Sequence, residues 1–589
     1  MKAFIQDLVE KNDFQPARLL SILRDIQSEY RYISKPAIEI LAEKLKIERT
    51  QIISVIEFYS FFHLEPRAQY DILLSDSITD LMAGKKSLMC YFSEQLDKQA
   101  IDQQLATINN TSCTGMCDQG PAALVNGYAL TRINKQRIDQ IVKLIKDQTA
   151  ITEWPSEFFK VTDNIHKPGL LLKSEIQPGE ALQSLFTHGI ENTLEKINFS
   201  DLRGRGGAGF STAMKWKFCS EEHLKERYVI CNADEGEPGT FKDRVLLNTY
   251  ANQVFEGMTL CAAIIGSKQG FLYLRGEYLH LYQQLQNVLT QRREQNLLGT
   301  NIQQQGLDFD IEIRLGAGAY ICGEESALIE SLEGKRGIPR NRPPYPVTQG
   351  YLNKPTVVNN VETFMAAAKI AVIGGKAFAD IGTHKSKGTK ILSISGDCQL
   401  PGIYEYPFGT TIKQILNDCG AEDVLGVQIG GPSGTFITNQ ELDRTLAFED
   451  LATGGSFIIF NNSRQILDLV KNFTHFFAHE SCGFCTPCRV GTALLKKQVD
   501  KIVDGHGSAG DVVALEELCQ LVKNNSHCGL GQTAANPILT TLERYPDIYQ
   551  QQLKDISYEP GFDLDASLET ARQLANRDDK AAHLTQVEE

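Results

Sequence analysis

Three cysteines stand three residues apart in the stretch Glu480-Ser-Cys-Gly-Phe-Cys-Thr-Pro-Cys-Arg489, and this spacing constrains the chain more than any other feature. One tight turn directs the thiolates of Cys482, Cys485 and Cys488 into a common volume. A fourth thiolate must come from elsewhere, and Cys528 is the best candidate. Four thiolates of this kind hold a cubane iron–sulfur cluster. The spacing therefore predicts a [4Fe-4S] site.

Other interpretations of these cysteines are weaker. Structural zinc sites usually take cysteines as separated C-x2-C pairs, whereas this chain has a triplet in one loop and a distant fourth residue. Buried cysteine without a ligand is common for one residue and improbable for three at this spacing. Cys519 lies close enough to Cys528 in the sequence to compete as the fourth ligand. A cluster passes single electrons, so the rest of the chain should supply an electron donor and an acceptor.

Length, charge and cysteine content limit the class of protein. A chain of 589 residues should hold three or four domains. Its net charge of −14 argues against nucleic acid or an anionic membrane surface as the main partner. No apolar run approaches the roughly 20 residues of a membrane span, and the first ten residues lack a signal-peptide pattern. The 14 cysteines then indicate ligands and buried thiols, so we expect a cytoplasmic protein without membrane insertion.

The first 150 residues predict a small α/β module. Apolar spacing predicts helices over 17–26 and 37–45, and Thr50 is a candidate N-cap for a helix over 51–61. A strand over 70–74 and a helix over 85–96 follow. Two short strands flank Asn126-Gly127, a strong hairpin signal.

The stretch 58–67, followed by Cys113 and Cys117, resembles the thioredoxin-like 24-kDa subunit of respiratory complex I. That family binds a [2Fe-2S] cluster through a C-x4-C pair and a C-x3-C pair. The first pair falls here on Ser75 and Asp80, which are poor substitutes for thiolates. We therefore expect no [2Fe-2S] cluster in this module, with an Asp/Ser-ligated cluster as the alternative. Without iron, the two cysteines pack the loop or oxidise to a disulfide.

A glycine-rich stretch over 202–216 begins the next region. Its three glycines at G-x-G-x-x-G spacing are Gly204, Gly206 and Gly209, a weak signal alone because no convincing strand precedes them. Backbone amides without neighbouring Cβ atoms can still close on an anion, and a following helix adds its N-terminal dipole. Arg203, Arg205 and Lys215 add positive charge, which makes a merely flexible turn the less favoured interpretation.

Strands and helices then alternate from 228 to 332, which predicts a mostly parallel sheet. The expected helices cover 180–196, 248–267, 278–294 and 326–332, and the expected strands cover 228–232, 270–275 and 309–315. Five acids follow a buried strand or a glycine loop: Asp234, Glu235, Glu237, Glu324 and Glu325. Carboxylates accept hydrogen bonds from sugar or ribityl hydroxyls, while glycine amides and basic groups take phosphate. This combination suits a nucleotide better than a solvated surface.

Four motifs stand in one order, at 204–210, 231–239, 319–325 and 356–363. Together with the cysteine triplet they resemble the flavin-bearing 51-kDa subunit of complex I over roughly 165–545. The resemblance implies FMN and NADH, with adenine between Phe210, Phe218 and Tyr345 and with Glu237 and Glu325 as catalytic residues at the nicotinamide half. The other cofactor-binding residues that it implies are Gly204, Arg205, Gly206, Gly207, Lys215, Asn232, Asp234, Glu235, Tyr320, Gly323, Glu324, Asn359, Asn360 and Thr363.

The expected fold is α/β and multidomain. Residues 1–150 form the helical and thioredoxin-like module, 165–380 the Rossmann-like FMN- and NADH-binding domain, 385–460 a β-grasp module that resembles the one in this family, 461–550 a helical [4Fe-4S] domain, and 551–589 a polar tail. Residues 145–170 read as a linker. The glycine loop Ile429-Gly-Gly-Pro-Ser-Gly434 reads as a plain turn.

Fusion of the two modules in one chain resembles the large diaphorase subunit of soluble NAD-reducing hydrogenases. This implies hydride exchange between NAD(H) and FMN, and single-electron transfer through the cluster to or from a small iron–sulfur subunit and a hydrogenase module. No nickel site is visible in the sequence, so hydrogen chemistry would lie on a partner. The corresponding subunit of an NAD-dependent formate dehydrogenase, the NADH-input subunit of complex I and a non-catalytic assembly scaffold remain alternatives.

Overall fold

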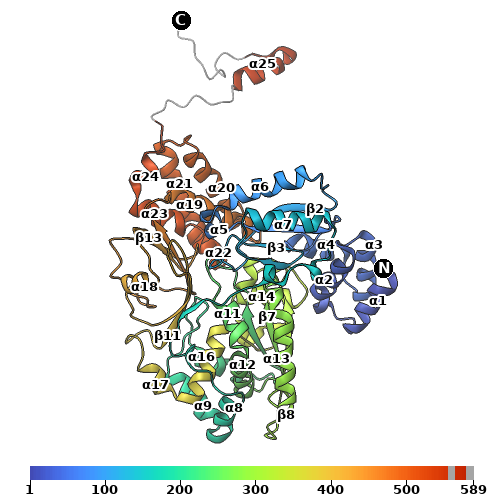
Figure 1. Cartoon of the computed structure of the whole chain (residues 1–589), viewed down its shortest axis with the longest axis vertical. Helices are drawn as coiled ribbons and strands as arrows, with labels where there is room; N and C mark the ends of the chain where they lie inside the picture. The colour runs from blue at the N-terminus through green and yellow to red at the C-terminus, as the bar shows by residue number, and fades with distance from the viewer. Residues whose placement is uncertain (555–563, 579–589) are drawn as a thin grey trace.

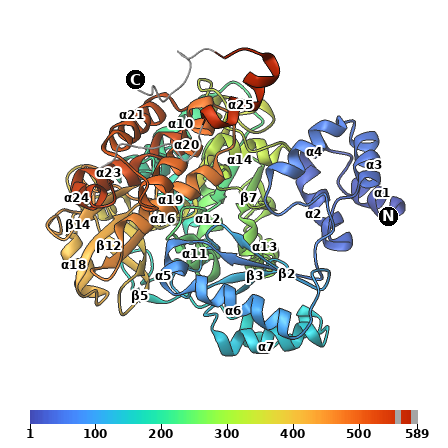
Figure 2. The same ribbon diagram turned by 90° about the horizontal axis from the view of Figure 1, so that it is seen from above.

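The computed structural model describes residues 1–554 and 564–578. The described residues form three sheets, of four, five and six strands in chain order. Figures 1 and 2 show the N-terminal helices at one side, the five-stranded sheet in the centre, and the C-terminal helices packed beside the six-stranded sheet. The expectation of an α/β multidomain chain is confirmed.

Residues 1–150 contain a helical part and a four-stranded sheet. The sheet order is β2-β1-β3-β4, with β1 and β2 parallel and the other pairs antiparallel. Asn126 and Gly127 have positive φ angles, 49° and 86°, and close the predicted hairpin. The predicted N-cap Thr50 is wrong, because α4 already begins at Arg49 after Glu48. The elements are α1 Lys2–Lys11, α2 Leu19–Tyr30, α3 Lys35–Leu45, α4 Arg49–Phe58, β1 Tyr70–Ser75, α5 Ile78–Met82, α6 Lys85–Lys98, β2 Ala106–Thr111, β3 Ala123–Val125, β4 Tyr128–Leu130 and α7 Lys135–Lys146.

The expected linker over 145–170 is not a free connection. Its short helical turns bury Trp154 and Phe158, and β5, Ile165–Lys167, pairs with β12 at the edge of the third sheet. Three residues are too few to show an alternating pattern in the sequence. This strand is recognised only from its pairing with β12.

The central sheet has the order β10-β6-β7-β9-β8 and is parallel except for the β8/β9 pair, as the alternation predicted. The strand β10 was not expected. The predicted helix over 180–196 breaks at Gly189, and the one over 248–267 breaks at Tyr250. The elements are α8 Glu180–His188, α9 Ile190–Phe199, α10 Thr212–Glu221, β6 Tyr228–Ala233, α11 Lys242–Thr249, α12 Ala251–Ile265, β7 Gln269–Leu274, α13 Tyr282–Glu294, β8 Gly299–Ile302, β9 Leu307–Leu315, η5 Tyr320–Gly323, α14 Glu325–Leu332, α15 Pro346–Gln349, β10 Thr356–Asn360, α16 Val361–Ile373 and α17 Gly375–Ala379.

Both faces of the central sheet are buried. Val229 and Cys231 of β6 join a core with α12 and α16. These two helices pack closely at Gly257, where a Cβ atom would lie 2.0 Å from the Phe364 carbonyl oxygen. Tyr228 and Ile230 face the opposite core, which contains side chains of α1–α4 and of the C-terminal helices. The N-terminal helices therefore cover the central sheet and share its core.

The third sheet has the order β14-β13-β15-β11-β12-β5. Thr411 caps α18 through its hydroxyl, which accepts from the Gln414 amide. The elements are β11 Thr389–Gly396, β12 Gly402–Pro407, α18 Ile412–Asp418, β13 Val424–Ile429, β14 Thr435–Thr438 and β15 Ser456–Asn461.

The C-terminal part is helical, as expected. Its elements are α19 Ile466–Glu480, α20 Thr486–Val503, α21 Ala509–Asn525, α22 Gly529–Thr533, α23 Asn536–Arg544, α24 Pro546–Gln550 and α25 Leu564–Ala575. The predicted polar tail over 551–589 contains α25, while 555–563 and 579–589 lie outside the described residues. Among the helices of the described ranges, none is long and apolar enough to cross a membrane.

Candidate functional site

The predicted site residues gather at one edge of the central sheet. The parallel strands β6, β9 and β10 end at this edge, and the acidic motifs and the Asn-Asn pair occupy or follow these strand ends. Open α/β sheets bind ligands at the carboxyl ends of their strands. The parallel pairing of these strands therefore brings together residues that lie far apart in the sequence.

The glycine loop closes on itself at this edge. The Gly204 amide donates to the Phe210 carbonyl over 2.9 Å, and the Thr212 amide donates to the Leu202 carbonyl over 2.9 Å. Gly207 has a φ of 131°, a conformation that strains other residues, and it is exposed together with Gly206. Helix α10 begins directly after the loop, so its N-terminus adds positive potential there.

Arg205 lies behind the glycine loop and not on its open face. Its guanidinium is buried, donates to the backbone carbonyls of Arg203 and Lys387, and lies 4.9 Å from the ring centroid of Phe408. Its own amide donates to the Thr363 hydroxyl over 2.9 Å, which ties the loop to α16. Burial lowers the pKa of Arg205 to about 10. Direct contact of this side chain with a ligand stays a prediction.

Lys215 and Asn359 are held by neighbouring groups. The Lys215 ammonium donates to Glu325 over 2.9 Å and to the Val358 carbonyl over 3.0 Å. The Trp216 indole donates to the Asn359 side chain over 2.9 Å. The structure thus brings together three predicted site residues, Lys215, Glu325 and Asn359, around the end of β10.

Asp234 has an unused acceptor. Its Oδ2 is buried and has no hydrogen-bond partner within the described ranges. Burial raises the pKa of Asp234 well above its usual value, and the positive charge of Arg275 opposes this. Asn232 lies beside it and donates to the Gly323 carbonyl over 2.8 Å. An unpaired buried carboxylate oxygen is costly unless a ligand hydroxyl reaches it, so this site fits the polyol chain of a flavin nucleotide.

Glu235 and Glu324 already have protein partners. Glu235 accepts from the amides of Asp243 and Arg244 and from the Tyr278 hydroxyl, and burial raises its pKa to about 7. Glu324 caps α14 by accepting from the amides of Ser326 and Ala327. Both carboxylates therefore shape the loops, and direct cofactor contacts of these two residues stay predictions.

Glu237 meets a residue that the sequence did not reveal. Its carboxylate accepts from the Tyr320 hydroxyl, the Ser433 amide and the Ser433 hydroxyl. Burial raises the pKa of Glu237 to about 7. Ser433 lies in the glycine loop that was predicted to be a plain turn, and its only signal was a hydroxyl between Pro432 and Gly434.

A buried ionic network lies beneath the site and was also missed. The Lys242 ammonium contacts Asp243 over 2.6 Å and Glu362 over 3.1 Å, and it donates to the Asn360 side chain. Lys390 of β11 donates to Glu362 and to the Arg205 carbonyl. This network links the third sheet to Asn360 and to the glycine loop.

Three aromatic side chains predicted to bind adenine are exposed. The exposed fractions are 49% for Phe210, 43% for Phe218 and 54% for Tyr345. Large exposed aromatics near a polar site suit stacking on a base. Their contact with adenine stays a prediction.

The four predicted cysteine ligands line one cavity. Cys482, Cys485, Cys488 and Cys528 surround it together with apolar side chains such as Ile321 and Leu530. Cys519 is buried in α21 and does not line the cavity, so the geometry favours Cys528 as the fourth ligand. Across 1–554 and 564–578, no three potential ligands are grouped closely enough for one metal ion. A cubane binds one thiolate at each of its four irons, so the four cysteines need not meet at a single metal position.

The two centres share a wall. Tyr320 contacts Glu237, and the next residue, Ile321, lines the cysteine cavity. Glu480, just before the cysteine loop, accepts from the Tyr320 amide over 3.1 Å. The nucleotide site and the cysteine site are therefore neighbours.

The N-terminal cysteines lie against the central domain. Cys113 and Cys117 are buried with their sulfur atoms 3.3 Å apart. Ser75 donates to Asp80, and Asp80 accepts from the Ala122 amide over 2.8 Å. Two of the four positions that hold the related cluster are therefore occupied here by oxygen donors, Ser75 and Asp80, which are hydrogen-bonded to each other.

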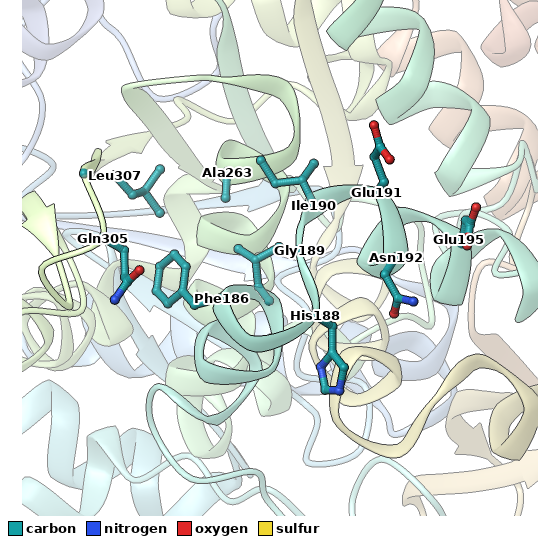
Figure 3. A pocket seen from close by; sticks show the side chains of 12 residues that line it. Phe186, His188, Gly189, Ile190, Glu191, Asn192, Glu195, Ala263, Gln305 and Leu307 are labelled. Atoms are coloured by element: carbon teal, nitrogen blue, oxygen red, sulfur yellow. The ribbon is translucent and has the colours of Figure 1, made fainter.

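A separate hollow of about 760 Å³ lies between α8, α9 and the β8–β9 turn. Figure 3 shows Phe186, Ile190 and Leu307 around it, with Glu191 and Glu195 at one side. It lies at the amino end of β9, opposite the edge that carries the predicted residues. The hollow is therefore not part of the nucleotide site.

Comparisons with known proteins agree with this geometry. The family model of the Nuo51 FMN-binding domain matches 197–369, that of the NADH-ubiquinone oxidoreductase-F iron–sulfur binding region matches 468–552, and that of the thioredoxin-like [2Fe-2S] ferredoxin matches 5–146. One subunit of the NADH-quinone oxidoreductase of Escherichia coli is 38% identical over 62% of this chain and 85% of its own length.

Two comparisons extend over nearly the whole chain. NAD-reducing hydrogenase HoxS subunit alpha of Cupriavidus necator is 42% identical over 96% of this chain and 98% of its own length. A chain of the NAD+-reducing [NiFe]-hydrogenase crystal structure in the H2-reduced state is 41% identical, with a TM-score of 0.88 over 98% of this chain and 99% of that chain. With its thioredoxin-like, FMN-binding and iron–sulfur regions in this order, the chain belongs to the family of the NAD-reducing hydrogenase alpha subunit.

Proposed function

We propose that this chain exchanges hydride between NAD(H) and FMN and passes single electrons through a [4Fe-4S] cluster to or from a partner iron–sulfur subunit of an NAD-reducing hydrogenase. The observation that carries the proposal is the wall formed by Tyr320 and Ile321 between the acidic site and the cysteine cavity. A flavin is needed there because it accepts two electrons together from nicotinamide and releases them one at a time.

The residues of the chain divide this work. The exposed glycine amides at 206 and 207 and the start of α10 suit a phosphate, and the free oxygen of Asp234 suits a ribityl hydroxyl. Phe210, Phe218 and Tyr345 suit adenine. Glu237 can hold a proton on its carboxylate near neutral pH, because burial raises its pKa to about 7.

Below these residues, Lys215 orients Glu325, while the Lys242 network braces Asn360. The four cysteine thiolates would hold the cubane in a cavity whose remaining walls are largely apolar.

We propose that the thioredoxin-like module holds no [2Fe-2S] cluster. The Asp80 side chain is occupied by Ser75 and the Ala122 amide, and oxygen donors bind iron more weakly than thiolates do. Its proposed role is docking: Arg244 is fully buried and donates to both carboxylate oxygens of Asp118 at 3.1 Å. Arg275 likewise donates to the Cys113 carbonyl.

The proposed partners are a small iron–sulfur subunit and, through it, a hydrogenase module. The match to the hydrogenase alpha subunit includes the N-terminal module, whereas the match to the E. coli NADH-quinone oxidoreductase covers only 62% of this chain. This difference favours the hydrogenase over the complex I alternative. A formate dehydrogenase is distinguished by native purification with metal analysis of the co-purified subunits. We also propose a cytoplasmic location, since none of the 14 cysteines, all within the described residues, forms a disulfide.

The test is NADH oxidation by the purified chain after reconstitution with FMN. Ferricyanide reduction should require FMN and should fall strongly in Asp234→Ala, while Glu191→Ala, at the unrelated hollow, should match the unmodified protein. A chain that binds FMN but does not oxidise NADH would contradict the proposal. A chain that binds neither FMN nor iron would support the assembly-scaffold alternative.

A further inference from the structure

The loop between β13 and β14 reaches from the third sheet into the nucleotide site. Residues 430–434 form this loop, and Ser433 lies at its tip against Glu237. The two residues are 196 positions apart. The contact therefore joins a domain with no predicted chemistry to the acidic motif.

The contact has a closed geometry. The Ser433 amide donates to one oxygen of Glu237 over 2.8 Å, and the Ser433 hydroxyl lies 3.1 Å from the other oxygen. The Tyr320 hydroxyl donates to that second oxygen and lies 3.1 Å from the Ser433 hydroxyl. Three hydrogen bonds from two residues, Tyr320 and Ser433, thus fix the plane of the Glu237 carboxylate.

The loop is shaped for this approach. Gly431 has a φ of 64°, and a Cβ there would lie 2.6 Å from the Glu237 side chain. On its other side, the Asn536 side chain of α23 donates to the Ser433 carbonyl over 2.8 Å. The loop is therefore held between the acidic motif and the helical domain that carries the cysteines.

We propose that Ser433 is a positioning residue for the nicotinamide half of the site, which orients Glu237 and links NAD(H) binding to the protonation of that carboxylate. The inference rests on the proposed function for the contact between Glu237 and NAD(H). The carboxylate form accepts hydrogen bonds from ligand N–H or O–H groups, and the neutral acid does so less well.

The titration of Glu237 depends on the groups around it. Burial raises its pKa, the hydrogen bonds from Tyr320 and Ser433 lower it, and the charge of Cys113 in the N-terminal module raises it. Glu480 lies beyond Tyr320 and interacts with that phenol. Because hydrogen bonds to a carboxylate favour its charged form, removing the Ser433 hydroxyl must raise the pKa of Glu237 further.

The test measures NAD+ binding by calorimetry from pH 6 to 9 on the full chain with FMN bound. The affinity for NAD+ should increase as Glu237 ionises, and Ser433→Ala should raise the midpoint pH of this increase by about half to one unit. Binding by the variant should then be a few-fold weaker at pH 7 and equal at pH 9. Ser433→Thr should restore the original midpoint, and Tyr320→Phe should shift it in the same direction as Ser433→Ala.

Ser463→Ala, at an exposed serine in the turn directly after β15, is the matched control. The pH profile of NADH oxidation should move together with the binding midpoint. Equal weakening at every pH, or loss of folding in Ser433→Ala with no shift in Tyr320→Phe, would overturn the proposal. Failure of the unmodified chain to bind NAD+ would instead contradict the proposed function.

Discussion

Asp80→Asn tests whether the thioredoxin-like module uses a neutral acid where its relatives use a cluster ligand. Asp80 is 1% exposed, accepts from Ser75 over 2.5 Å and accepts from the Ala122 amide over 2.8 Å. Burial raises the pKa of Asp80 to about 8, against the opposing effect of the Ser75 hydrogen bond. The carboxyl group is thus mostly protonated in the folded chain at neutral pH.

The sign of the effect follows from linkage. The unfolded chain releases this proton near pH 4 and the folded chain near pH 8, so stability falls as pH rises between these values. Each unit costs about 1.4 kcal/mol, so the module should lose roughly 2–3 kcal/mol between pH 6 and 8. Asparagine does not ionise, and Asp80→Asn should lack this loss.

The assay is urea unfolding of the full chain, followed by the fluorescence of Trp154, which is buried against this module. A Trp216→Phe background removes the second tryptophan, and Asp97→Asn serves as an exposed control. Parallel stability curves for the unmodified protein and the Asp80→Asn variant between pH 6 and 8 would refute the reasoning. An Asp80 that is ionised in the folded chain, as an iron ligand would be, would add no pH dependence of stability in this range and would give this result.

Three further outcomes are expected. Ser75→Cys combined with Asp80→Cys should allow a [2Fe-2S] cluster to form on anaerobic reconstitution, seen as visible charge-transfer bands with two irons above the unmodified chain. Stoichiometric iron and sulfide in the unmodified module would contradict the proposed absence. Cys528→Ser should remove the [4Fe-4S] EPR signal and leave NADH oxidation by ferricyanide intact; loss of the signal in Cys519→Ser alone would contradict the assignment of the fourth ligand. Asp234→Ala should weaken FMN binding roughly 5- to 100-fold in a fluorescence titration, since leaving a buried flavin hydroxyl without its partner costs about 1–3 kcal/mol, and unchanged affinity would show that no flavin hydroxyl contacts this oxygen.

Local patterns predicted the elements that depend on neighbouring residues. The hairpin at Asn126-Gly127 follows from the conformational preferences of two adjacent residues. The breaks at Gly189 and Tyr250 were missed because the apolar pattern continues through both positions. The strands β5 and β10 were missed because pairing with a distant edge, and not composition, makes them strands.

The sequence by itself determined which chemical groups this protein can use. The cysteine triplet, the acids after the strands and the glycine loop each place their groups within a single turn of the chain. Only the tertiary structure decided how these groups meet. It placed Cys528 and not Cys519 at the cavity, turned the Arg205 guanidinium away from the loop surface, and brought Ser433 to Glu237. The physical reason is that turn geometry acts over a few residues, whereas these contacts depend on packing between sheets and helices far apart in the chain.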